Sequence, residues 1–274
     1  MSKSHLNPDP SRTLGTMAKL IRLTEKEGID WSHWQHPTNN PVARRNLAEY
    51  LRRGCPKLGD NGEVIQTCFP EGHELALLIL GDDYISAQEV ATAYGVSYTD
   101  EQLEHFADTL PGMEAILWLR ANGYMLIAEP PTEMNLLEVR ELENKLFSFK
   151  TKGWYAEDKQ KFSREDKVSA GEWLAIRKEA VPNSFSKTWS EQQDLLSEDE
   201  YVPNAVEVSY AVTAYYKVRG IYLLRSNKYV RTSSVSTYSD RVDVGRFDRD
   251  GLNIRYYWEG SHLGNLGISS ARKL

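Results

Sequence analysis

The sequence predicts an α+β protein with two domains. At 274 residues the chain is longer than one compact domain usually needs, and it contains enough apolar residues for two cores. Helical patterns prevail in the first half, whereas short strand patterns separated by turn residues prevail near the end. We therefore expect a smaller, mainly helical N-terminal domain over residues 1–130, a linker over 131–152 and a second domain over 153–274.

A β-hairpin near residues 55–68 is predicted to contain the only two cysteines. The pair Asn61-Gly62 is the strongest short turn signal of the chain. With this pair as a two-residue turn, Cys55 faces Cys68 at a distance that a disulfide can bridge. Two unlinked cysteines in a reducing compartment are the alternative. A disulfide-dense scaffold is excluded by the cysteine count.

Residues 85–110 resemble a helix-turn-helix, with a glycine at the turn. The second helix, over 99–110, has four acidic residues and no Lys or Arg, so DNA phosphates would repel it. We expect a packed helical hairpin instead. An apolar helix over 111–123 and a buried strand over 124–128 follow, before the breaker "EPPTE".

The second half begins with an alternating strand over 171–179. Thr188 and Glu191 then form a capping box that opens a short helix. A longer helix should begin at Pro203 and end at Gly220. Short strands are expected after it, and the last can return beside the first: 221–224, 229–233, 241–247, 252–258 and 268–272.

The last 24 residues, from Gly251, combine an ordinary strand-and-turn frame with a middle that follows no period. From Arg255 to Gly264 neither helix nor strand spacing is present. Just before them, "DRDG" over 248–251 resembles half a calcium loop. The rest of that ligand series is missing, so we expect a tight turn with Gly251 at positive φ.

The element order over 171–272 is that of a C-type lectin fold, and the frame "RVDVGRFDRDGLNI…YW…LGNLGISSARK" resembles the variable proteins of diversity-generating retroelements. The resemblance spans roughly Gly153 to Leu274 and is strongest in the last forty residues. It implies that a reverse transcriptase rewrites the 3′ end of the gene from a template repeat, with errors confined to adenines. Asparagine codons of the template then become many residues, while the codons between them preserve the fold. The implied function is ligand binding through a hypervariable surface, as in receptor recognition, with no catalysis and no cofactor.

Under this resemblance nine ligand-binding positions should form one exposed surface. Each holds a residue that a mutated Asn codon can encode, whereas Trp258 and Glu259 cannot arise in this way. Tyr, Ser, Gly, His and Arg are typical of adaptable binding surfaces. The nine positions are Arg246, Arg249, Arg255, Tyr256, Tyr257, Ser261, His262, Leu263 and Gly264. The frame residues that should be buried are Val242, Val244, Phe247, Leu252, Ile254, Trp258, Leu266 and Ile268.

The residues favour neither an enzyme nor a metal site. His33, His36 and His73 lie near the cysteines, but their spacings match no compact zinc pattern. A formylglycine-generating enzyme has a related fold and needs reactive cysteines, which residues 69–274 lack. We find no phosphate loop, zinc-protease motif or serine nucleophile elbow.

Charge and hydropathy limit the partners. A net charge of −6 argues against general attraction to nucleic acid or anionic membrane. No run reaches the ~20 apolar residues of a membrane span, and the polar start lacks the core of a signal peptide. We expect a protein that is soluble when made, in the cytoplasm, in a virion or exported by another route, with an unknown protein or surface ligand as partner and the oligomeric state open. The alternative is a nucleic-acid or general interaction protein that uses Arg241, Arg246, Arg249 and Arg255.

Overall fold

The computed structural model describes residues 57–58, 64–66, 72–148 and 153–274, in two compact units of residues 1–69 and 70–274. In the first unit, β1 (Lys57–Leu58) and β2 (Val64–Gln66) form an antiparallel pair. Lys57 pairs with Gln66, which is the register that a turn at residues 61–62 predicts, although the pairing shifts by one residue at Leu58. The expected hairpin is therefore confirmed in its strands. Cys55, Cys68 and the turn lie outside the described residues.

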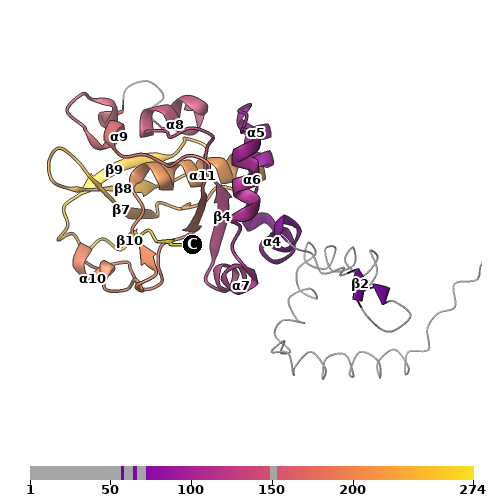
Figure 1. Cartoon of the computed structure of the whole chain (residues 1–274). Coiled ribbons are helices and arrows are strands. Elements are labelled where there is room, and N and C mark those ends of the chain that lie inside the picture. Colours follow the sequence, from indigo (N-terminus) through magenta and orange to yellow (C-terminus); the bar gives the residue numbers. More distant parts are fainter. Residues whose placement is uncertain (1–56, 59–63, 67–71, 149–152) are drawn as a thin grey trace, which may run out of the picture. The chain divides into compact units, whose positions relative to one another are not determined.

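The larger unit contains two sheets, which Figure 1 shows beside the long helix α11. The first has five strands in the order β3-β4-β5-β11-β6, with β3 parallel to β4 and the other pairs antiparallel. Its strands are β3 (Tyr84–Ile85), β4 (Tyr124–Ala128), β5 (Trp173–Arg177), β6 (Glu200–Tyr201) and β11 (Ala271–Arg272). The chain end thus returns beside β5, as the sequence predicts, with Ala271 opposite Ile176 and Arg272 opposite Ala175.

The second sheet has four strands in the order β10-β7-β8-β9, with β10 parallel to β7 and the other pairs antiparallel. Its strands are β7 (Tyr229–Val235), β8 (Arg241–Gly245), β9 (Asn253–Tyr257) and β10 (Leu266–Ile268). The three predicted strands at 229–233, 241–247 and 252–258 are confirmed, with ends that differ by a few residues. Three of the nine predicted binding positions lie on β9 of this sheet, and the other six lie in the segments that follow β8 and β9.

The helices of this unit begin at well-formed caps. Five of them start with a capping box, including the one predicted from Thr188 and Glu191. The longest helix begins one residue after Asn204 rather than at Pro203, because the Asn204 side chain accepts from two of its first amides; it ends at Gly220 as predicted. The helices are α4 (Gly72–Leu80), α5 (Ala87–Tyr94), α6 (Asp100–Asp108), α7 (Met113–Ala121), α8 (Leu136–Leu142), α9 (Phe162–Glu165), α10 (Trp189–Gln193) and α11 (Ala205–Arg219), with 3-10 turns η1 (Gly81–Asp83), η2 (Asn144–Leu146) and η3 (Trp154–Ala156).

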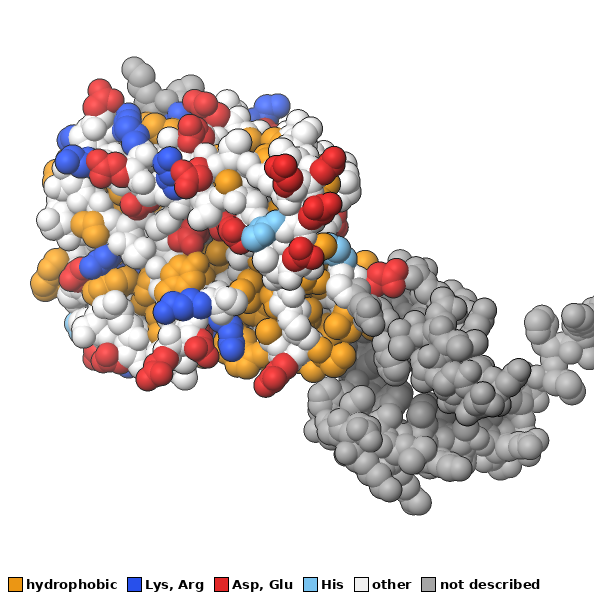
Figure 2. Space-filling view, viewed as in Figure 1, with side chains coloured by type: hydrophobic (Ala, Val, Ile, Leu, Met, Phe, Trp, Pro, Cys, Tyr) orange, Lys and Arg blue, Asp and Glu red, His pale blue; other side chains and the backbone are white. Residues whose placement is uncertain are grey.

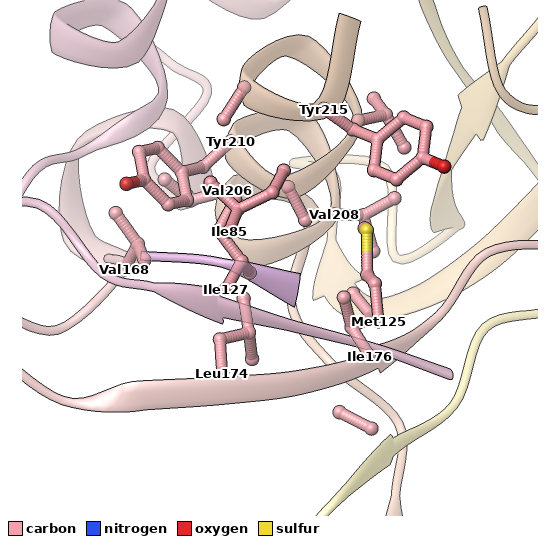
Figure 3. Close-up of a cluster of buried hydrophobic side chains, with 14 of the residues drawn as sticks. Ile85, Met125, Ile127, Val168, Leu174, Ile176, Val206, Val208, Tyr210 and Tyr215 are labelled. Atoms are coloured by element: carbon pink, nitrogen blue, oxygen red, sulfur yellow. The ribbon is translucent and has the colours of Figure 1, made fainter. Parts of the chain in front are cut away.

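The core lies between α11 and the five-stranded sheet. Figure 3 shows apolar side chains of α11 directed toward those of β3, β4 and β5. Every residue of β4 is fully buried, as the sequence predicts for 124–128, and the Tyr210 hydroxyl of α11 donates to the Ala128 carbonyl at 2.7 Å. Most of α11 is buried in this core, so its packing holds β3, β4 and β5 in place.

The domain boundary expected at residues 131–152 is wrong. β4 pairs with β5 over five residues, so residues 70–130 belong to the same compact unit as the C-terminal half. The expected linker contains α8, whose Leu136 and Val139 are buried in the shared core. A fully buried strand such as β4 needs a partner strand on each edge. One partner is β3, and the other, β5, lies beyond the predicted boundary.

Two strand predictions need correction. Residues 221–224 form no strand but an irregular segment, in which Leu224 has a φ of 51°. The expected strand 268–272 is divided, because Ser269 and Ser270 leave β10 and lead the chain across to β11 in the other sheet. Within the described ranges, α11 is the longest helix at 15 residues, and none is long and apolar enough to cross a bilayer.

Candidate ligand-binding face

The frame of the predicted binding segment is buried, with one exception. Seven of its eight residues have at most 1% of their surface exposed: Val242, Val244, Phe247, Leu252, Ile254, Leu266 and Ile268. Trp258 is 69% exposed, so its predicted burial is wrong. β9 ends at Tyr257 and the chain then turns, with the Ser261 amide donating to the Trp258 carbonyl at 3.0 Å. The indole therefore lies over Gly260, where a Cβ would come within 2.5 Å of it, and not in the core.

None of the nine predicted binding residues is buried, and they come from three segments. Four are exposed, namely Arg246, Arg249, His262 and Gly264, and Tyr257 joins them at 37%. The other four, Arg255, Tyr256, Ser261 and Leu263, are half-buried. They come from the turn after β8, from β9 and from the loop at residues 258–264. These segments do not place all nine side chains on one surface.

Tyr256 is on the opposite face of the second sheet from its neighbours. In β9, Ile254 and Tyr256 share one face, while Arg255 and Tyr257 share the other. The Tyr256 ring packs edge-on against Trp154 with centroids 4.6 Å apart. Tyr256 therefore belongs to an aromatic cluster next to η3 rather than to the surface that Tyr257 forms.

Arg255 has a structural role beneath the face. Its guanidinium forms an ion pair with Asp243, which is fully buried on the neighbouring strand β8. It also lies over the rings of Tyr229, at 3.3 Å, and Tyr257, at 4.7 Å. Burial raises the pKa of Asp243 to about 6, and the nearby Arg255 opposes that shift. A different residue at position 255 would leave Asp243 buried without this partner.

The turn at residues 248–251 has the geometry expected from "DRDG". The Gly251 amide donates to the Asp248 carbonyl at 2.9 Å, and Gly251 has a φ of 96°. A Cβ on Gly251 would lie 2.6 Å from the main chain of Phe147, so glycine is required there. Arg246 and Arg249 on either side of the turn start are exposed, and Arg246 is 3.9 Å from the Asp248 carboxylate.

The 258–264 loop is held to the domain through its main chain. The Arg231 side chain donates from Nη2 to the carbonyls of Trp258, at 3.1 Å, and Ser261, at 2.9 Å. The amides of Trp189 and Ser186 donate to the carbonyls of Glu259, at 2.9 Å, and Leu263, at 3.1 Å. All four acceptors are backbone atoms of the loop. The side chains of Ser261 and His262 form no hydrogen bonds within the described part of the chain, so the loop conformation does not depend on them.

Arg231 is a functional residue that no sequence-based prediction includes. It is fully buried on β7 and also donates to Gln192, at 2.9 Å, and to the Lys187 carbonyl, at 3.1 Å. Burial lowers its pKa, and the negative charge of Asp243 acts in the opposite direction. An arginine among the apolar and hydroxyl residues of "YVRTSSV" is the signal that points to such an anchor.

Two of the four arginines of the alternative prediction are paired with carboxylates, while Arg246 and Arg249 are exposed. Arg241 is paired with Glu259 at 2.7 Å, and Arg255 is paired with the buried Asp243. Elsewhere, Figure 2 shows acidic side chains gathered over α6, the second helix of the predicted helical hairpin. α5 ends at Gly95, where the prediction places the turn, and α6 begins at Asp100, whereas α5 packs mainly against α11 and β4 rather than against α6. This acidic helix would be repelled by a nucleic-acid backbone.

In the part of the chain that the structure covers, no group of three or more His, Cys, Asp or Glu side chains could hold a metal ion. No family model, curated protein or solved structure matches this chain.

Proposed function

We propose that the protein binds ligands through the 258–264 loop and the adjoining end of β9, and that this surface is diversified by adenine-directed copying of the 3′ end of its gene. The observation that carries the proposal is the main-chain anchoring of the loop by Arg231, Trp189 and Ser186. A loop that is held by its carbonyls keeps its path when its side chains change. Such a loop can present many surfaces on one scaffold.

The proposed scaffold is a C-type lectin-like fold. The supporting features are the order of a strand, two helices and several short strands, and the return of β11 beside β5. The second sheet carries the proposed binding loop between β9 and β10.

The proposed contact surface is smaller than the nine predicted positions. Tyr257, Ser261, His262, Leu263 and Gly264 form its centre, because their side chains or backbone reach the surface without packing in the core. Arg246 and Arg249 are exposed on the separate turn after β8. The Arg255 guanidinium packs on the Tyr257 ring and so helps to orient it. Tyr256 packs against Trp154 instead.

A display library tests the binding proposal. Positions 261–264 are randomised to Arg, Tyr, Ser, His, Leu, Gly and Asp and selected against a panel of purified proteins and glycans. The matched control randomises four exposed positions of α6, namely Asp100, Glu101, Glu104 and Asp108. We expect target-specific sequences to be enriched from the loop library and not from the α6 library. Equal enrichment from both libraries, or none from the loop library, would reject the binding proposal.

The DNA around the gene tests the diversification proposal. We expect a reverse transcriptase gene nearby and a repeat of the 3′ end that differs from it only at adenines. The differences should fall mainly in the codons of Tyr257 and positions 261–264, and should spare those of Val242, Val244 and Ile254. Differences spread evenly over frame and loop codons would contradict the proposal.

A further inference from the structure

A second concave site lies next to the 258–264 loop, between α10, β6 and the start of β8. This cleft, which we call the α10 cleft, has a volume of about 480 Å³. One wall is apolar and is formed by Trp189, Leu196 and Val202, which pack together over Ile268. In Figure 2 hydrophobic side chains gather in the lower half of the view, between the positions of α10 and α7 in Figure 1. None of the residues that line the cleft belongs to the nine predicted binding positions.

Next to the apolar wall, the α10 cleft contains a fixed cation, Arg241. The Arg241 guanidinium lies over the Trp189 ring at 4.3 Å. Its Nε donates to Glu259 at 2.7 Å and its Nη1 to the Ser233 carbonyl at 2.9 Å. Within the described residues Nη2 has no hydrogen-bond partner, and it is not among the buried polar atoms that lack one. Arg241 therefore keeps solvent-accessible donors while three contacts hold it in place.

The remaining polar groups of the cleft determine how a charged ligand would be oriented in it. Both Glu200 oxygens are occupied, since Oε1 accepts from Ser270 at 2.8 Å and Oε2 from the Ser197 hydroxyl at 2.9 Å. Hydrogen bonds lower the pKa of Glu200 despite the opposing effect of its burial, so it is ionised at neutral pH. An anionic group is therefore repelled from the Glu200 end. At the other end Glu259 offsets much of the Arg241 charge, so a carboxylate there is bound mainly through the hydrogen-bond donor at Nη2. An apolar group suits the wall between them.

We propose that the α10 cleft binds an apolar carboxylate, with the carboxylate on Arg241 and an aromatic or branched aliphatic group against Leu196 and Val202. Such a group can come from a free organic acid or from the C-terminal residue of a peptide. The cleft shares no lining residue with the nine predicted binding positions, and the loop residue that holds Arg241, Glu259, is not one of them, so the cleft stays constant when the 258–264 surface varies. The protein then has an invariant binding site, the α10 cleft, next to the variable 258–264 surface.

The test uses the full chain and a pair of probes that differ only in charge, N-acetyl-L-phenylalanine and its primary amide. Binding is measured by calorimetry and by amide chemical shifts. We expect the acid to bind about tenfold more tightly than the amide, as loss of one charge-assisted hydrogen bond implies. Arg241→Gln should reduce the affinity for the acid to that for the amide and leave the affinity for the amide unchanged. Leu196→Asn should weaken both.

Arg225→Gln is the matched control, because Arg225 is an exposed arginine outside the cleft. Equal affinities for acid and amide, or equal effects of the Arg241 and Arg225 substitutions, would overturn the proposal, as would no saturable binding of the acid. A peptide that ends in a free Phe distinguishes the two sources: binding equal to the acid assigns a peptide C-terminus, and exclusion of the peptide assigns a free acid. Alanines at Ser261 and His262 should leave binding of the acid unchanged, so failure here leaves the loop proposal intact.

Discussion

Glu129 is a carboxyl group buried at the end of β4. Glu129 is only 5% exposed, and its Oε2 has no hydrogen-bond partner in the described part of the chain. Burial raises the pKa of Glu129 from 4.5 to about 8, and the negative charges of Glu207 and Glu172 add to this effect. The carboxyl group is therefore mostly protonated in the folded protein at neutral pH.

We predict that Glu129→Gln stabilises the protein at pH 7 by about 2 kcal/mol. The unfolded chain loses this proton near pH 4.5, whereas the folded chain keeps it to about pH 8. The stability that wild type gains from binding this proton in the folded state is thus fully present below pH 4.5. It is lost as the pH rises to about 8. Denaturant unfolding of wild type and variant from pH 4 to 8.5 measures this. Glu104→Gln, at an exposed position of α6, is the control, and a gain at pH 7 no larger than at pH 4 would contradict the prediction.

At the level of single residues, the sequence predicts burial better than it predicts roles. The alternation of Val242, Val244 and Ile254 reveals which side chains face the core. A Trp codon cannot arise from a mutated Asn codon, which separates Trp258 from the variable positions but says nothing about its burial. Trp258 is exposed because the chain turns directly after β9. The roles of Glu129 and Arg231 depend on distant segments that pack around them. No local pattern contains those contacts.

At the level of elements, the contact between β7 and β8 depends on a glycine. A Cβ on Gly245 would lie 2.6 Å from the Tyr229 Cα of the paired strand and closer still to the Lys228 carbonyl oxygen. Backbone atoms cannot move aside as a flexible side chain can. Gly264, which is one of the predicted variable positions, has no neighbour nearer to such a Cβ than the Ser186 hydroxyl at 3.7 Å.

We predict that Gly245→Ala lowers the free energy of unfolding by about 3 kcal/mol, because it forces β7 and β8 apart. Gly264→Ala should change it by no more than about 0.5 kcal/mol. Chemical denaturation of the two variants beside wild type measures the difference. Comparable losses in the two variants would show that position 264 is as constrained as the frame.

Elements with a local signature could be predicted from the sequence. The helix at Thr188 was predictable from its capping box, and the end of α11 from Gly220. Residues 221–224 are as apolar as a strand but find no partner strand, and Leu224 takes a left-handed conformation instead. The division of 268–272 between two sheets is a tertiary feature. No alternation within those five residues indicates it.

At the level of the molecule, residues 70–274 form one compact unit. The two prolines at 130–131 end β4, and the "EPPTE" segment therefore resembles a domain boundary in the sequence. The main chain continues to pair across it, with the Gly171 amide donating to the Pro130 carbonyl at 2.9 Å. From α11, Arg219 donates to Glu89 on α5 and to the Tyr84 carbonyl on β3, both at 2.6 Å.

We predict that a fragment of residues 70–274 unfolds in a single cooperative transition, whereas residues 131–274 do not fold. Without β3, β4 and α5, one edge of β5 and one side of α11 lose the apolar surface that covers them. Near-UV circular dichroism and denaturant titration of both fragments measure this. Cooperative unfolding of the 131–274 fragment would restore the domain boundary predicted from the sequence.

The most direct test of the binding-loop account is the free energy of unfolding of two variants. One replaces three loop side chains at once, Ser261→Tyr, His262→Ser and Leu263→His, and the other is Arg231→Leu. Because the loop is held by its carbonyls, the triple variant should remain within about 1.5 kcal/mol of wild type. Arg231→Leu should lose about 3 kcal/mol or more, since it removes the buried donor of those bonds. A loss of several kcal/mol in the triple variant, with little change in Arg231→Leu, would contradict the account.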